Sequence, residues 1–140
     1  MEFAGKTVMV TGAAGALGRS LAEAFAAEGA ALVLVDLHAA GLAKAHGGAH
    51  RQIAVDITDA GRVSDLVGAA AADGIDVLCN IAGGFAMGPP VHETPPGMWD
   101  DMLGRNAVSV VNMARAVVPA MKARGERISR EVLPAELEAA

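Results

Sequence analysis

The chain has 140 residues, enough for one domain, and a formal net charge of −5 with no cluster of basic residues. Binding to a phosphate backbone needs a basic surface, so this composition argues against a nucleic-acid partner. Glu2 stands where a secretory signal needs positive charge, and no apolar stretch approaches the roughly 20 residues that span a bilayer. With a single cysteine, Cys79, that cannot form an internal disulfide, we expect a cytoplasmic protein without membrane partners.

Apolar runs of strand length alternate with segments of helical period, which is typical of repeated βαβ units around a parallel sheet. We predict four strands, near residues 6–11, 31–35, 51–55 and 75–80. Three helices are predicted between them, over 17–28, over 38–48, and from a cap at Thr58-Asp59 to about Gly74. The second of these has little apolar face and is therefore weakly specified.

The apolar residues of the predicted helices indicate which faces pack on the core. Leu17, Leu21 and Phe25 share one face of the first helix. Val63, Leu66, Val67 and Ala70 share one face of the third.

A long helix over 98–118 is predicted next, with a stripe of Met and Trp side chains as its core face and Pro119 bending or ending it. We place one domain over residues 1–128 and a polar tail over 129–140.

Three glycines, Gly12, Gly15 and Gly18, lie between the first strand and the first helix. Glycines in this position let backbone N–H groups approach a pyrophosphate at the positive end of a helix, with no side chain in the way. We predict a phosphate-binding turn here, the alternative being a glycine turn with a purely structural role.

Asp36 ends the second strand, 18 positions after Gly18. This is the spacing of an acid that bonds the ribose hydroxyls of a dinucleotide. A carboxylate there would repel a 2′-phosphate, and neither Ala14 nor Leu37 offers a base, so NAD is favoured over NADP. A solvated residue at the strand end is the alternative.

Four segments, taken together, resemble the short-chain dehydrogenase/reductase family. They are the turn Thr11-Gly12-Ala13-Ala14-Gly15-Ala16-Leu17-Gly18, Val55-Asp56-Ile57-Thr58-Asp59, Asp76-Val77-Leu78-Cys79-Asn80-Ile81-Ala82-Gly83, and Trp99-x-x-Met102-x-x-x-Asn106. The resemblance covers residues 3–128. It implies a Rossmann-type three-layer α/β sandwich with a parallel sheet of about four strands in the order 3-2-1-4, whose second half is incomplete.

The resemblance also implies roles for individual residues. Asp56 and the backbone after it would hold the adenine ring, Asn80 would steady the central strands, and Ala82-Gly83 would border the cofactor's ribose. Asn106 matches a residue that helps hold a proton-relay water. The full predicted cofactor site is Gly12, Ala14, Gly15, Leu17, Gly18, Asp36, Leu37, Asp56, Ile57, Asn80, Ala82 and Gly83, with no metal. Without the family, Asn80 is interpreted as a hydrogen-bonding residue at a strand end and Asn106 as a packing or loop-bracing amide. Ile81 stands where the family has a second Asn.

The family's reaction moves a hydride between the nicotinamide and a carbinol carbon, and it needs a Tyr, a Lys four positions later and a Ser. This sequence contains no tyrosine, and its lysines, Lys6, Lys44 and Lys122, lie outside such a context. Ser129 has no neighbouring base, and His92 is expected to be an inert loop residue. We therefore predict no turnover by this chain.

Three hypotheses follow for the function. The chain could be the NAD-binding half of an oxidoreductase, or a non-catalytic partner of a full-length homologue. In that second case it would associate through the helix 98–118 and the edge of the strand 75–80, as a homo-oligomer or with the homologue. The third hypothesis is a truncated gene product without a function of its own.

Overall fold

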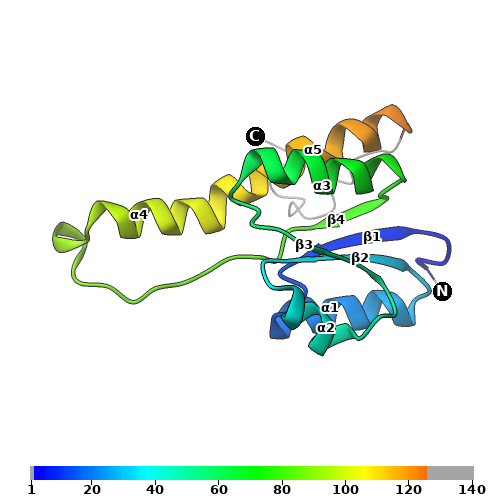
Figure 1. Cartoon of the computed structure of the whole chain (residues 1–140), viewed down its shortest axis with the longest axis horizontal. Helices are drawn as coiled ribbons and strands as arrows, with labels where there is room; N and C mark the ends of the chain where they lie inside the picture. The colour runs from blue at the N-terminus through cyan, green and yellow to red at the C-terminus, as the bar shows by residue number, and fades with distance from the viewer. Residues whose placement is uncertain (1, 126–140) are drawn as a thin grey trace, which may run out of the picture.

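The structure is a computed structural model that describes residues 2–125 (Figure 1). Its centre is a parallel sheet of four strands, ordered β3-β2-β1-β4. The strands are β1 (Thr7–Thr11), β2 (Ala31–Asp36), β3 (Arg51–Ala54) and β4 (Val77–Cys79). The predicted Rossmann-type architecture and strand order are confirmed. The predicted tail over 129–140, with Ser129 and the domain boundary at 128, lies outside the described residues.

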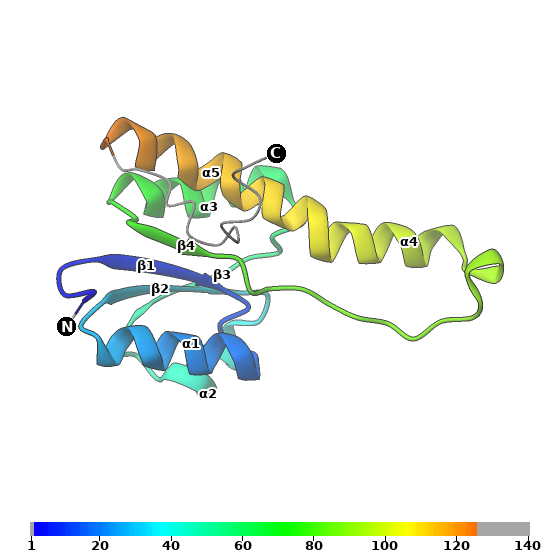
Figure 2. The ribbon, with the colours of Figure 1, turned by 180° about the vertical axis from the view of Figure 1, so that it is seen from behind.

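Helices cover both faces of this sheet, as Figures 1 and 2 show. On one face lie α1 (Ala16–Ala27) and α2 (Ala39–His46). On the other lie α3 (Ala60–Ala72) and α5 (Ser109–Ala123). Between β4 and α5 the chain forms a short 3-10 turn, η1 (Val91–Glu93), then α4 (Pro96–Leu103) and a π-helical turn, η2 (Gly104–Val108).

Alternate residues of the central strands enter two separate apolar clusters, because successive side chains of a strand point to opposite faces. Met9 and Val33 pack toward α3 and α5, with Met113 of α5. Val8 and Leu34 pack toward α1 and α2. Both faces of β1 and β2 are therefore buried, which explains why these strands are continuous apolar runs.

The predicted core face of α1 is wrong in its first turn. Gly18 and Ala22 are the buried residues of α1, whereas Leu17 is 68% exposed. The close approach of α1 to the end of β1 turns Gly18 inward and leaves Leu17 at the mouth of a cavity described below. Further along, Phe25 packs edge-on against the ring of Phe3, as a partly buried member of the core.

The helices α2 and α3 agree more closely with the pattern of apolar residues in the sequence. Asp59 caps α3, its side chain accepting the N–H of Arg62 at 3.1 Å. Val63, Val67 and Ala70 are buried as predicted, while Leu66 remains 42% exposed. The weakly specified α2 is anchored by one fully buried side chain, Leu42.

The long helix predicted over 98–118 is divided into α4, η2 and α5, and its predicted core face is wrong in part. Pro119 does not end the helix, since α5 continues past it to Ala123. Val117 and Met121, on either side of Pro119, both pack in the apolar cluster that contains Val63 of α3. The predicted Met and Trp core face is only partly buried: Met113 and Val117 are in the core, but Trp99 is 49% exposed.

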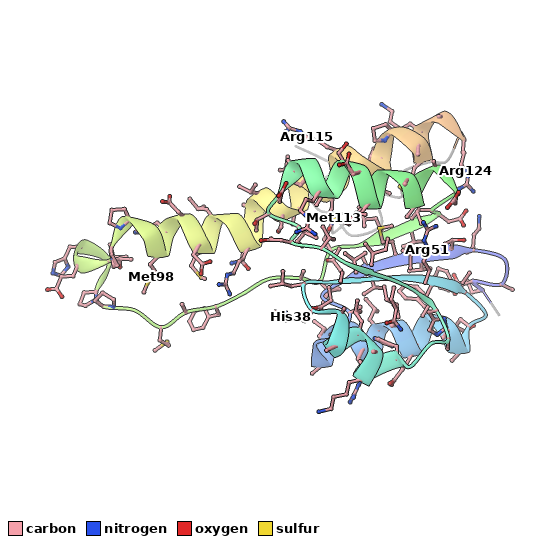
Figure 3. All side chains as sticks on the ribbon, in the orientation of Figure 1. His38, Arg51, Met98, Met113, Arg115 and Arg124 are labelled. Atoms are coloured by element: carbon pink, nitrogen blue, oxygen red, sulfur yellow. The ribbon has the colours of Figure 1, made fainter. Side chains whose placement is uncertain are left out.

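The reason for the exposed Trp99 is the placement of α4. This helix projects beyond the end of the sheet, so its side chains have no strand beneath them (Figures 1 and 2). Figure 3 shows the contrast between Met98, far from the sheet, and Met113, which points toward it. No helix among residues 2–125 is both long and apolar enough to cross a membrane.

Candidate functional site

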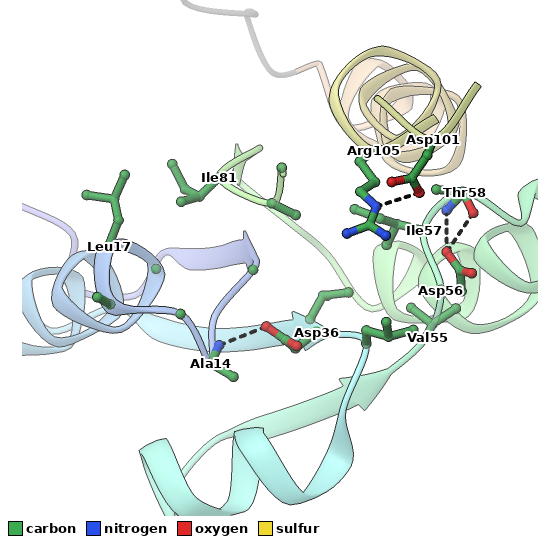
Figure 4. Close-up of a pocket in the computed structure, with 18 residues that line it drawn as sticks. Ala14, Leu17, Asp36, Val55, Asp56, Ile57, Thr58, Ile81, Asp101 and Arg105 are labelled. Carbon is green, nitrogen blue, oxygen red and sulfur yellow. Dashed lines mark hydrogen bonds and ion pairs between the residues drawn. The ribbon is translucent and has the colours of Figure 1, made fainter. Parts of the chain in front are cut away.

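A cavity of about 660 Å³ opens at the carboxyl ends of the four strands (Figure 4). This edge of a parallel sheet is where open α/β folds bind ligands. All the predicted cofactor residues except Asn80 line it. The lining residues are Gly12, Ala14, Gly15, Ala16, Leu17, Gly18, Val35, Asp36, Leu37, Val55, Asp56, Ile57, Thr58, Ile81, Ala82, Gly83, Asp101 and Arg105.

The glycine turn is packed so tightly that two of its positions admit no side chain. Gly12 has a φ of +66°, and a Cβ there would lie 2.8 Å from the Cα of Ala82. A Cβ on Gly18 would overlap the carbonyl oxygen of Gly12. These contacts place the start of α1 directly beside β1 and β4.

The amino end of α1 is open toward the cavity. Gly15 is the N-cap residue of α1, and no side chain caps the helix there. The first N–H groups of a helix have no partner within the helix, and they carry its positive dipole end. The residues from Gly15 to Gly18 line the cavity, so the turn fits an anionic group such as a pyrophosphate.

Thr11 joins the ends of β1 and β4 beneath this turn. Its hydroxyl oxygen accepts the N–H groups of Ile81 and Ala82, each at 3.0 Å, and the hydroxyl donates to the carbonyl of Cys79 at 3.4 Å. The side chain is almost fully buried. Sequence reasoning assigned Thr11 no such role, and its one signal was a polar residue closing an apolar strand.

Asp36 lies on the cavity wall beside the glycine turn. Its Oδ2 accepts the N–H of Ala14 at 3.0 Å, drawn in Figure 4, and its Oδ1 accepts the N–H of His38 at 3.3 Å. From α2, the ring nitrogen Nε2 of His46 makes a 2.7 Å hydrogen bond with the carbonyl oxygen of Ala13. The turn is thus held from two sides, and the contribution of His46 was missed because α2 has so weak a pattern.

Asp56 is held in its ionised form by Thr58. The Thr58 hydroxyl donates to Asp56 Oδ1 at 2.7 Å and the Thr58 N–H at 2.9 Å, and these two bonds keep the pKa of Asp56 below its usual range. Burial opposes this and raises the pKa by less than either Thr58 bond lowers it, while the charges of Arg62 and Arg105 lower the pKa by still smaller amounts. A carboxylate here can accept a hydrogen bond from a ligand's amino group.

The two asparagines predicted from the family lie outside the cavity lining. Asn80 follows β4, and its side chain is exposed. Asn106, in η2, clamps the loop after β4: its Oδ1 accepts the N–H of Gly84 at 3.1 Å and its Nδ2 donates to the Gly84 carbonyl at 2.8 Å. The roles predicted for both residues stay predictions.

The comparisons with known proteins agree with this geometry. A family model described as short chain dehydrogenase matches residues 6–128. The chain belongs to the short-chain dehydrogenase family. Members of this family bind a nicotinamide dinucleotide, and the cavity lies at the carboxyl ends of the strands, where open α/β folds bind their ligands.

Two relatives with similar sequences illustrate the relationship. The D-threitol dehydrogenase of Mycolicibacterium smegmatis is 40% identical over 121 residues, covering 81% of this chain and 46% of that protein. The galactitol 2-dehydrogenase of Agrobacterium fabrum is 33% identical over 135 residues, or 91% of this chain and 52% of that protein. The chain thus spans about half the length of these relatives.

Solved short-chain dehydrogenase structures share the fold. An NAD⁺-bound xylitol dehydrogenase superposes with a TM-score of 0.83 at 30% identity, over 90% of this chain and 52% of that one. A metagenomic short-chain oxidoreductase in complex with NADP superposes with a TM-score of 0.82 at 26% identity, over 90% of this chain and 61% of that one. Both cofactors therefore occur among similar structures.

Proposed function

We propose that this chain is the NAD-binding part of a short-chain dehydrogenase, with the dinucleotide bound in the 660 Å³ cavity. The open amino end of α1 supports a pyrophosphate position at Gly15–Gly18, because the first N–H groups of that helix face the cavity without a side-chain cap. Asp36 would accept the adenosine ribose hydroxyls, and Asp56 and Ile57 would border the adenine.

The observation that carries the choice of NAD is the position of the Asp36 carboxylate. It is bonded to the N–H of Ala14 inside the turn, so a 2′-phosphate on the same ribose would lie beside a negative charge. Its neighbours Ala14 and Leu37 carry no cation. The nearest positive side chain that lines the described cavity, Arg105, lies across it in Figure 4 and is paired with Asp101.

Calorimetric titration of the whole chain with NAD and NADP tests this proposal. We expect NAD to bind about tenfold more tightly, which corresponds to about 1.4 kcal/mol of repulsion. Asp36→Asn should bring the affinities for NAD and NADP closer together. Asp65→Asn makes an equal charge change at an exposed position of α3 and should leave the ratio of the two affinities unaltered. A folded protein that gives no heat with NAD on the order of millimolar concentration would contradict the proposal.

We further propose that the 140-residue chain binds the cofactor without turning it over. The bound nicotinamide supplies hydride transfer, but the sequence contains no tyrosine to exchange the substrate's proton. D-Threitol and galactitol, the substrates named for two relatives, are the first alcohols to try. Formation of NADH by the purified chain with either alcohol would overturn the proposal.

Association with a second chain is a second candidate function, favoured by an edge strand and by an exposed apolar helix face. β4 is the edge strand of the described sheet, and Trp99 and Leu103 on α4 are each about half exposed. A strand edge and an apolar helix face are both able to pair with another chain. Size-exclusion chromatography tests this, alone and mixed with a full-length homologue; a chain that stays monomeric in both would contradict it.

A further inference from the structure

Arg105 stands out among the residues around the cavity. It is the one cationic side chain in the described lining, which also contains three acids, Asp36, Asp56 and Asp101. A cation in a site for an anionic ligand suggests a contact with phosphate, but the position of Arg105 indicates a different contact.

The π-helical turn η2 determines where Arg105 points. π-turns insert one extra residue into a helix and occur often at functional sites. Next to Arg105, Asn106 holds Gly84 through both its backbone N–H and its carbonyl group, at 3.1 and 2.8 Å. The Cδ of Arg105 consequently lies against Gly84, where a Cβ would be only 2.9 Å away.

The orientation of the guanidinium is set by Asp101, one helical turn earlier. Arg105 Nε donates to Asp101 Oδ1 at 2.7 Å, as Figure 4 shows. The terminal nitrogens extend past Ile57 into the cavity in that view. Their charge reaches Asp56, because Arg105 contributes to the lowered pKa of that carboxyl.

The guanidinium is therefore a braced, planar group on the wall that also contains Asp56 and Ile57. The glycine turn, with Ala14 and Leu17, lies on the opposite side of the cavity in Figure 4. A pyrophosphate at the start of α1 would thus be far from Arg105, whereas the base at the other end of the adenosine would be beside it.

We infer that Arg105 stacks its guanidinium on the adenine ring of the bound dinucleotide, with Asp101 holding it in plane. This inference rests on the proposed function, because it needs adenine near Asp56. A guanidinium is flat and weakly hydrated, so it packs well on an aromatic face while its edge keeps a hydrogen bond to a carboxylate. Arg105 is then a binding residue for the base, and Asp101 is a positioning residue.

Calorimetric titration of the whole chain with ADP-ribose and, separately, with adenosine tests the inference. Arg105→Met removes the planar cation while keeping the length, and it should weaken both ligands equally, about 3- to 10-fold. Arg105→Lys should also bind more weakly than wild type, because an ammonium does not stack as a guanidinium does. Asp101→Asn should give a smaller loss.

Arg115→Met is the matched control, because Arg115 lies on α5 outside this cavity and its loss changes the net charge equally (Figure 3). It should bind both ligands as wild type does. All variants should first be compared by circular dichroism, since the exposed position of Arg105 predicts that they fold.

Three results would overturn the inference. If Arg105→Met bound both ligands like wild type, the stacking would be wrong and the NAD site would stand. A second result would identify Arg105 as a phosphate contact instead. In that case Arg105→Lys would bind ADP-ribose as tightly as wild type, and Arg105→Met would lose affinity for ADP-ribose alone, with the loss vanishing at high salt. If wild type bound neither ADP-ribose nor NAD, both the inference and the proposed function would fail.

Discussion

The hydroxyl oxygen of Thr11 accepts the backbone N–H of Ala82 at 3.0 Å, and the two residues lie 71 positions apart in the sequence. The same oxygen accepts the N–H of Ile81. Thr11 therefore ties the glycine turn, which it precedes, to the segment after β4 that lines the cavity. The spacing between the two walls of the cavity therefore depends on Thr11.

Thr11→Val should destabilise the protein by about 2 kcal/mol, because it leaves two backbone N–H groups without their acceptor in a buried place. The shape of the side chain is kept, so packing contributes little. Urea unfolding measures the change. Thr11→Ser retains the hydroxyl and should stay closer to wild type; equal stability of Thr11→Val and wild type would remove the role assigned to this oxygen.

Two glycines within helices offer a matched comparison. Gly18→Ala should lower the free energy of unfolding by about 1–3 kcal/mol, because its Cβ overlaps the Gly12 carbonyl oxygen. Gly68 lies in α3, where a new Cβ would meet no atom within 4 Å beyond its own helix backbone. Gly68→Ala should therefore raise the free energy of unfolding by about 0.5–1 kcal/mol. Thermal unfolding of both variants measures these opposite signs, and two shifts of the same sign would contradict the packing described for the turn.

Asp56 should stabilise the protein in a pH-dependent way. Its folded-state pKa is below the ordinary value, mainly because of the Thr58 hydroxyl. The stabilisation is therefore complete above the unfolded pKa, about 3.9, and is lost as the pH falls through the lower folded pKa.

Carboxyl NMR titration measures this pKa directly. Thr58→Val should move the pKa of Asp56 up toward the ordinary value, whereas Thr58→Ser should leave it low. A titration of Asp56 at the ordinary value in wild type would show that the two bonds from Thr58 do not persist in solution.

Asn112 should be needed to hold the loop that contains Asp56. The side chain is buried in α5, and its Nδ2 donates to the carbonyls of Ile57 and Thr58 at 3.1 and 3.2 Å. Asn112→Leu should lower the free energy of unfolding by about 1–3 kcal/mol, because two carbonyls lose their donor. It should also weaken NAD binding.

The neighbouring Val111→Ala is the control for Asn112, because Val111 is 48% exposed and its truncation leaves the loop untouched. Urea unfolding and NAD titration of both variants make the comparison. If Asn112→Leu were as stable as Val111→Ala, the two hydrogen bonds would have no measurable part in holding the loop.

Several features of this protein could be predicted from the sequence alone, since they depend on local rules. The spacing of Gly12, Gly15 and Gly18 after an apolar run predicted the turn, because only glycine admits so close a backbone approach. The family motifs predicted the strand order β3-β2-β1-β4 and eleven of the residues that line the cavity, which is the predicted set without Asn80. Asp59 was predicted as a cap because capping needs only the next three residues.

Only the tertiary structure decided the contacts between distant segments. Helical periodicity placed Leu17 and Trp99 in the core, but whether an apolar face is covered depends on which elements lie beside it. Leu17 instead borders the cavity, and Trp99 lies on a helix that projects past the sheet. Thr11 and Arg105 showed no distinctive sequence pattern, because their partners are brought near by the path of the whole chain or by the extra residue of a π-turn.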